Sequence, residues 1–343
     1  MKNTAIRIPA VLIAIVAAML FATCKPSHET VTPSKPETAT AAKRQASPAV
    51  RFGTGGKAVD YAPFYVAKNK HWFEDSFAQQ GHTASYVEFD SAPTINESFG
   101  SNRVDLVFVA EPPVIIGRSA GIDIRIVGIS CSLRQEVLVR KESTIRSVAN
   151  LKGKKIAVLK GSSSHYGVYQ IIRAAGLRPA DITIVDMLPP DARTAFESGQ
   201  VDAWAVWPPW VEQEEIAGTG RVLPGADVKI HSILSSRGGF ATEHPDLVRQ
   251  AVAVLDRAKK WIIENPDEAK RIVAQELGVS IDVVAKAWPR HDFQAQITPD
   301  VISNIQAKSD FLFDNGIIKQ KIDVKAGFID LSFLPASPAT GTK

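Results

Sequence analysis

Strand-like and helix-like segments alternate from residue 49 to residue 334 of this 343-residue chain, and this alternation limits the possible folds more than any other feature. Short runs of β-branched residues, such as 104–109 and 156–159, are followed by segments in which apolar residues recur at helical spacing, such as 165–175. This pattern is typical of α/β folds, in which helices cover a mainly parallel sheet. The segment is also long enough for two lobes with cores of their own. We therefore predict an α/β protein.

The expected elements follow from these periodicities. The expected strands cover residues 49–53, 85–89, 104–109, 124–129, 136–139, 156–159, 182–185 and 201–207. The expected helices cover residues 62–73, 94–99, 114–120, 165–175, 191–197, 245–264, 267–277, 281–288 and 299–315. The last four helices are amphipathic, and we expect them to pack back on the first lobe.

The N-terminus indicates where the protein works. Lys2 and Arg7 precede an apolar run, residues 8–21, which Pro9 interrupts. The run is short for a membrane span and is typical of an export signal. We therefore read residues 1–24 as an export signal and place the mature protein in the periplasm. Cys24 stands where bacterial lipoproteins are cleaved and lipidated, which would anchor the protein to the outer face of a membrane. The alternative is an ordinary signal peptide cut nearby, with Cys24 lost or left free.

Composition separates the tether from the folded part and excludes some functions. Residues 25–48 are rich in Pro, Thr, Ser, Ala and Lys without an apolar period, and we predict a flexible tether there, with a short C-terminal tail at 335–343. Residues 1–44 hold six of the 40 Lys and Arg and two of the 36 Asp and Glu, which leaves 34 of each beyond them. This balance does not favour a nucleic-acid-binding face. The two cysteines, Cys24 and Cys131, build no disulfide framework and no cysteine metal site.

The segment Gly161-Ser162-Ser163-Ser164-His165-Tyr166 carries the clearest chemical signal. It follows the expected strand 156–159 and opens the expected helix 165–175. The free N–H groups and the dipole at a helix N-terminus attract anions, and serine hydroxyls there add donors. The segment is therefore a candidate anion site. The simpler interpretation is that one serine caps the helix.

Several segments together resemble a known family. They are Gly161 to Tyr166, Leu188-Pro189-Pro190-Asp191-Ala192-Arg193, Gly199-Gln200-Val201-Asp202-Ala203-Trp204, Trp207-Pro208-Pro209, Glu111-Pro112-Pro113 and the run from Ser147 to Lys155. In these segments the chain resembles the nitrate, taurine and sulfonate solute-binding proteins of ABC importers, and within them the aliphatic sulfonate-binding branch.

This resemblance implies a fold and a function. The fold would be a two-lobed type II periplasmic binding protein with a ligand cleft between the lobes, which are joined by two strands. The first lobe would be discontinuous, with residues 49–139 and 236–334, and the second would hold residues 140–235. The protein would be a monomer without a cofactor, which closes on a small organic oxyanion and delivers it to an ABC permease with its ATPase. Another small anion (taurine, nitrate or an arylsulfonate) is the alternative ligand, and an enzyme or sensor on the same fold is the alternative class.

The resemblance also suggests the oxyanion site. Hydrogen bonds to a sulfonate head group would come from Ser162, Ser163, Ser164 and His165. For His165, a capping or packing role at the helix start is an equally good interpretation. Glu111 ends a first-lobe strand and is expected to face the cleft, as ligand sites in α/β proteins do. There it would accept a hydrogen bond or pair with an arginine such as Arg134 or Arg237; otherwise it is a solvated charge at the rim.

Aromatic residues are the candidates for the tail pocket. Trp207 would form one wall, with Tyr61, Phe64 and Pro112 facing it from the first lobe, whereas we expect Trp204 to pack in the core. Sulfonate-binding relatives commonly have Asp after the matching tryptophan, where this chain has Pro208. This departure argues against a ligand whose ammonium group needs a carboxylate at that position.

Enzyme motifs are absent from the sequence. The seven histidines show no His-Glu-x-x-His spacing, no Gly-x-Ser-x-Gly turn is present, and Gly53-Thr54-Gly55-Gly56-Lys57 lacks the end of a phosphate-binding loop. We therefore expect neither a catalytic residue nor a metal site.

Overall fold

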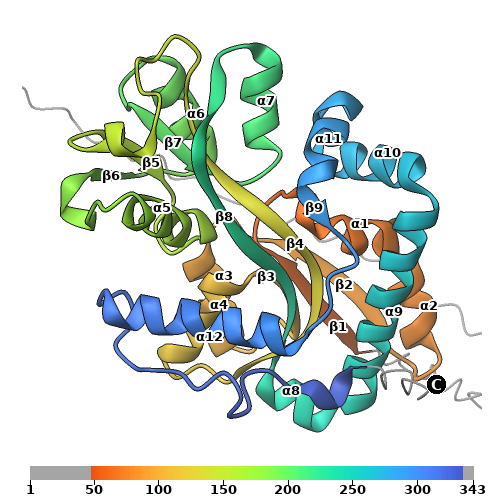
Figure 1. Cartoon of the computed structure of the whole chain (residues 1–343). Coiled ribbons are helices and arrows are strands. Elements are labelled where there is room, and N and C mark those ends of the chain that lie inside the picture. Colours follow the sequence, from red (N-terminus) through yellow and green to blue (C-terminus); the bar gives the residue numbers. More distant parts are fainter. Residues whose placement is uncertain (1–47, 335–343) are drawn as a thin grey trace, which may run out of the picture. The chain divides into compact units, whose positions relative to one another are not determined.

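A computed structural model of the protein describes residues 48–334. They form a 9-stranded sheet in the order β2-β1-β3-β8-β4-β7-β5-β6, with β9 pairing with β4 (Figure 1). The predicted α/β class is confirmed. The predicted export signal with Cys24, almost all of the tether and the C-terminal tail lie outside the described residues. No helix between residues 48 and 334 is long and apolar enough to cross a membrane.

One end of the sheet carries the parallel strands of the first lobe. These are β1 (Ala49–Thr54), β2 (Thr83–Glu88) and β3 (Leu106–Ala110). The helices that follow them are α1 (Ala62–Asn69), α2 (Trp72–Ala78), α3 (Ala92–Gly100) and α4 (Glu111–Ser119), and a short 3-10 helix, η1 (Val59–Tyr61), precedes α1. Phe52 of β1 is the centre of this core, because its ring lies 4.5 Å from that of Phe73 and also packs on Phe64, Phe77 and Phe108.

Two long strands connect the lobes. β4 (Ile124–Arg140) and β8 (Gly220–Arg237) pair with each other in antiparallel fashion, while β3 pairs with β8 and β7 pairs with β4 (Figure 1). The segments 124–129 and 136–139, expected as two strands, are therefore one. The polar pair Arg134-Gln135 interrupts the apolar pattern, but the backbone keeps its ladder with β8 through this stretch. The sequence pattern does not predict β8, which contains a proline and a left-handed glycine, Gly225.

The second lobe repeats the βα pattern at the other end of the sheet. Its strands are β5 (Lys155–Val158), β6 (Thr183–Asp186) and β7 (Ala203–Val206), and its helices are α5 (Ser163–Ala174), α6 (Pro189–Glu197) and α7 (Trp210–Ala217). Trp204 is 1% exposed and packs against Phe196 and Trp210, which confirms its predicted place in the core.

The last helices return to the first lobe, as predicted. They are α8 (Gly238–Glu243), α9 (Pro245–Glu264), α10 (Pro266–Leu277), α11 (Ile281–Ala287) and α12 (Pro299–Asp314). α9 packs on α1, α2 and β4, α10 packs on α1, and α12 packs on α4. α11 also contacts α7 of the second lobe, and β9 (His291–Asp292) follows it and pairs with β4.

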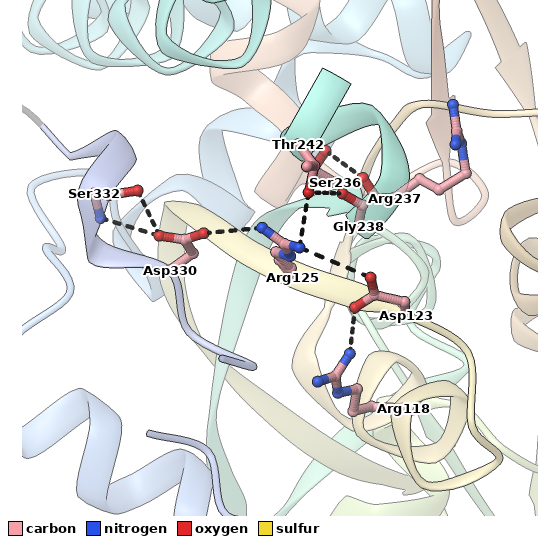
Figure 2. Close-up of polar contacts among 9 residues, drawn as sticks. All are labelled: Arg118, Asp123, Arg125, Ser236, Arg237, Gly238, Thr242, Asp330 and Ser332. Atoms are coloured by element: carbon pink, nitrogen blue, oxygen red, sulfur yellow. Dashed lines mark hydrogen bonds and ion pairs between the residues drawn. The ribbon is translucent and has the colours of Figure 1, made fainter. Parts of the chain in front are cut away.

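A polar cluster holds the segment around Asp330 against β4. The guanidinium of Arg125 lies 3.5 Å from the carboxylate of Asp330 and donates to the Thr242 hydroxyl at 3.0 Å (Figure 2). Asp123 lies between Arg125 and Arg118, which donates to it at 2.5 Å. The cluster therefore links β4, α4, α8 and the segment before residue 334.

Candidate functional site

A cavity of about 40 Å³ lies between the start of α5, the loops of the first lobe and the connecting strands β4 and β8. The lining residues are Gly55, Ala58, Asp60, Tyr61, Asp90, Ser91, Ala92, Ile95, Val109, Ala110 and Pro113 from the first lobe, Leu133 and Ile230 from the connecting strands, and Leu159, Ser162, Ser163 and Trp207 from the second lobe. The cavity thus fits a small ligand that touches both lobes.

The turn from β5 into α5 presents hydrogen-bond donors to this cavity. Gly161 has a φ of 79°, a left-handed conformation that glycine adopts without strain. Ser162 is the N-cap of α5, and its hydroxyl accepts from the N–H of His165 at 3.3 Å and donates to the carbonyl of Leu159 at 2.7 Å. The simpler capping interpretation is therefore correct for Ser162.

The next two residues keep their backbone donors free. Ser163 and Ser164 occupy the first turn of α5, where N–H groups have no intrahelical acceptor, and no acceptor for them is found among residues 48–334. Both side chains are buried, and Ser163 lines the cavity. The N-terminus of α5 therefore offers unpaired N–H groups at the positive end of a helix dipole.

Gln135 orients these serines, and the sequence reasoning missed it. Its Nε2 group donates to the Ser163 hydroxyl oxygen at 2.9 Å and to the Ser164 hydroxyl oxygen at 2.6 Å. Each hydroxyl that accepts from Gln135 retains its own proton, which the Ser163 hydroxyl can donate into the cavity. The only signal in the sequence was a polar residue inside an otherwise apolar strand segment.

His165 does not line the cavity. Its Nδ1 atom accepts from the N–H of Gly161 at 3.3 Å, and its ring packs on Tyr169 at 4.8 Å. Burial, and then the charge of Lys160, lower the pKa of His165, so its imidazole is neutral at neutral pH. The structure thus gives His165 a turn-holding and packing position, the second of the two roles considered for it.

Two of the predicted aromatic residues line the cavity, and the other two predicted wall residues do not. Trp207 donates from Nε1 to the carbonyl of Lys57 at 3.2 Å and so bridges the two lobes beside the cavity, where Tyr61 also lies. Phe64 points instead into the aromatic core around Phe52. Pro112 is buried in the first turn of α4, and its neighbour Pro113 is the proline that reaches the cavity.

Glu111 lies away from the cavity, and the prediction that it pairs with Arg134 or Arg237 is wrong. The side chain is wholly buried, pairs with Lys308 of α12 and accepts from the N–H of His231 at 2.9 Å. Arg134 pairs with Asp227 and Arg237 with Asp105 instead. Burial lowers the pKa of Lys308, and the charge of Glu111 opposes this shift. The carboxylate at this strand end therefore neutralises a buried lysine.

Asp60 is a cavity residue that the sequence reasoning missed. It lies in η1 and is 4% exposed. Burial and, to a smaller extent, the charge of Glu111 raise the pKa of Asp60 to about 6. Hydrogen bonds from the Ser232 hydroxyl and from the N–H of Asp60 itself oppose this shift. Asp90 lines the same cavity but is exposed at its edge.

No cluster of His, Cys, Asp and Glu that could hold a metal ion is found in the described part of the chain.

The conformation of Gly161 gives a prediction about this turn. Alanine in the left-handed region costs about 1–2 kcal/mol, and no atom would clash with the new Cβ. Gly161→Ala is therefore expected to lower the free energy of unfolding by about that amount and to weaken anion binding, because the backbone before α5 must shift. Urea unfolding and calorimetry would measure both effects. Gly81→Ala, at a left-handed glycine (φ 74°) on the first lobe, is the control and should lower stability alone; equal ligand binding by the two variants would contradict the prediction.

Comparison with known proteins agrees with this architecture. The family model described as "NMT1/THI5 like" matches residues 58–269. A Bacillus subtilis (strain 168) protein named as a candidate aliphatic sulfonates-binding protein is 34% identical over 279 residues, which are 80% of this chain and 84% of that protein.

Solved structures show the same fold. The alkanesulfonate-binding protein SsuA from Xanthomonas axonopodis pv. citri, bound to MOPS, superposes with a TM-score of 0.72 at 26% identity, over 82% of this chain and 98% of that one. The periplasmic aliphatic sulphonate binding protein SsuA from Escherichia coli superposes with a TM-score of 0.70 at 26% identity, over 82% and 97%.

An enzyme is among the more distant relatives. The 2'-hydroxybiphenyl-2-sulfinate desulfinase of Rhodococcus erythropolis is 26% identical over 153 residues, which are 42% of each chain. The match to the family model over more than half of the chain, together with the sulfonates-binding relative, shows that this chain belongs to the NMT1/THI5-like family.

Proposed function

We propose that this protein is an extracytoplasmic solute receptor of an ABC importer, which binds a small organic sulfonate and delivers it to the permease. The observation that carries the proposal is the start of α5, where the N–H groups of Ser163 and Ser164 are unpaired beside a cavity between the lobes. The sulfonate-binding relatives support the choice of ligand.

The geometry explains how a sulfonate would be held. Its oxygens would accept from the two backbone N–H groups and from the Ser163 hydroxyl, which Gln135 keeps oriented. Hydrogen bonds to a charged group contribute roughly 1.5–3 kcal/mol each, and the helix dipole adds up to about 1 kcal/mol. The organic tail would pack on Trp207 and Tyr61, whose apolar rings suit a short carbon chain.

The location of the cavity between the two lobes supports a receptor whose lobes close on the ligand. β4 and β8 are the strands that run from one lobe to the other, so a bend in them would change the width of the cavity. A ligand that touches both Ser163 and the first-lobe loops would favour the closed form, which the permease would then recognise. We place the protein in the periplasm, or on the outer face of the membrane if Cys24 is lipidated.

A thermal-shift panel tests this function. Because a ligand that binds only the native state raises the melting temperature, alkanesulfonates and taurine should stabilise the protein in a concentration-dependent way. Nitrate, sulfate and arylsulfonates complete the panel and decide between the alternative ligands. No shift with any sulfur oxyanion would refute the sulfonate assignment. Chemical change of a bound sulfonate or sulfinate after incubation, followed by mass spectrometry, would indicate an enzyme instead.

A further inference from the structure

The cavity beside α5 has an acidic lining, although we propose that it binds an anion. Asp60 and Asp90 line it, and no lysine, arginine or histidine is among its lining residues in the described part of the chain. An anion that entered this cavity alone would meet the charge of Asp60 at short range, in surroundings where charges are weakly screened. The lining thus lacks a positive charge that would balance the carboxylates.

Asp60 carries the negative charge of this lining that is hardest to stabilise, because its carboxylate is buried. Its side chain is almost fully buried, and none of the ion pairs found among residues 48–334 includes it. Glu111, whose charge acts on Asp60, is a second acid, and Lys308 is already paired with it. Buried carboxylates are normally paired or bind a cation, since leaving one alone costs free energy.

Helix capping does not account for this carboxylate. The N-caps of η1 and α1 are Ala58 and Tyr61, and neither helix start shows a side-chain cap hydrogen bond. The backbone carbonyl of Asp60, which accepts from the Ser130 hydroxyl at 2.8 Å, would make the same bond whatever the side chain. The carboxylate therefore faces the cavity with only the Ser232 hydroxyl and its own N–H as hydrogen-bond partners, and no ion pair found among residues 48–334 balances its charge.

We propose that Asp60 is a cation subsite and that the ligand is a zwitterion, a short aminosulfonate whose ammonium group binds Asp60 while its sulfonate binds the start of α5. This inference rests on the proposed sulfonate site. Both groups line one small cavity, so the two charges of the ligand must be separated by a short carbon chain. Asp90, exposed at the edge, adds a weaker attraction for the same ammonium group.

Such a zwitterion would connect the two lobes, because Asp60 belongs to the first lobe and Ser163 to the second. A ligand bound to Asp60 at one end and to Ser163 at the other would hold the two lobes together, whereas a simple alkanesulfonate would have only apolar contacts with the first lobe.

Calorimetric titration with matched ligands tests the proposal. The probes are 2-aminoethanesulfonate and ethanesulfonate, measured at pH 8, where Asp60 is ionised. A charge-assisted hydrogen bond is worth about 1.5–3 kcal/mol, so the wild type should bind 2-aminoethanesulfonate roughly 10–100-fold more tightly. Asp60→Asn should remove this preference by weakening 2-aminoethanesulfonate binding, while ethanesulfonate binds as well as before or better. Asp282→Asn, an exposed aspartate on α11, is the matched control and should keep the preference.

The outcomes separate this inference from the proposed function. Equal binding of the two probes by the wild type, or an equal effect of Asp60→Asn on both, would overturn the cation subsite while the sulfonate receptor stands. Binding of neither probe would refute the receptor and the subsite together. A lower melting temperature of the Asp60→Asn protein with an unchanged ligand preference would assign the carboxylate a structural role and would also overturn the proposal.

Discussion

Replacing Lys308 with methionine is expected to lower the free energy of unfolding by about 3–5 kcal/mol, the cost typical of breaking a buried ion pair from one side. Lys308 and Glu111 are both almost completely buried and pair with each other between α12 and α4. Methionine fills a similar volume, so the loss comes from the unpaired carboxylate that remains. Urea unfolding, followed by circular dichroism, measures it.

Two further variants make this prediction specific. Glu111→Gln combined with Lys308→Met removes both charges and should recover part of the lost stability. Lys321→Met removes a lysine whose side chain is 62% exposed and pairs with Asp310 at 3.4 Å, and it should change stability by less than about 1 kcal/mol. If Lys308→Met were no more destabilising than Lys321→Met, the account of Glu111 as a structural residue would be wrong.

Replacing Ser163 with leucine is expected to abolish sulfonate binding, with an increase in Kd of at least about 100-fold. The variant removes a hydroxyl donor worth roughly 1.5–3 kcal/mol for a charged ligand, and the larger side chain fills space that the head group needs in a cavity of about 40 Å³. Titration calorimetry with 2-aminoethanesulfonate and ethanesulfonate measures the loss.

The control for this variant is Ser303→Leu, on the exposed side of α12. It introduces the same side chain away from the cavity and should leave both dissociation constants unchanged. Circular dichroism should show that both variants are folded. A Ser163→Leu protein that is folded and binds both sulfonates like the wild type would contradict the oxyanion site at α5.

Local signals made the oxyanion turn predictable from the sequence. A β-branched strand, a glycine and a series of serines before an apolar period are all short-range features, and β5, the left-handed Gly161 and α5 follow from them. The periodicity around Trp204 and Trp207 likewise separated a core tryptophan from one at the cavity. Each of these predictions depends on residues within a few positions of one another.

The residues that the sequence did not place depend on partners far along the chain. Glu111 ends a strand, as expected, but its side chain turns to Lys308, which is 197 positions away. Gln135 gains its role from serines of another element, and β8 holds a proline and a left-handed glycine that interrupt the usual strand pattern. Asp60 is an isolated acid whose importance appears only once the other lining residues surround it.

The crystal structure of the complex with 2-aminoethanesulfonate tests the central claim most directly. The account predicts that the sulfonate oxygens lie within about 3 Å of the backbone nitrogens of Ser163 and Ser164, between the two lobes. A sulfonate bound elsewhere on the protein, with these two N–H groups still unpaired, would contradict it.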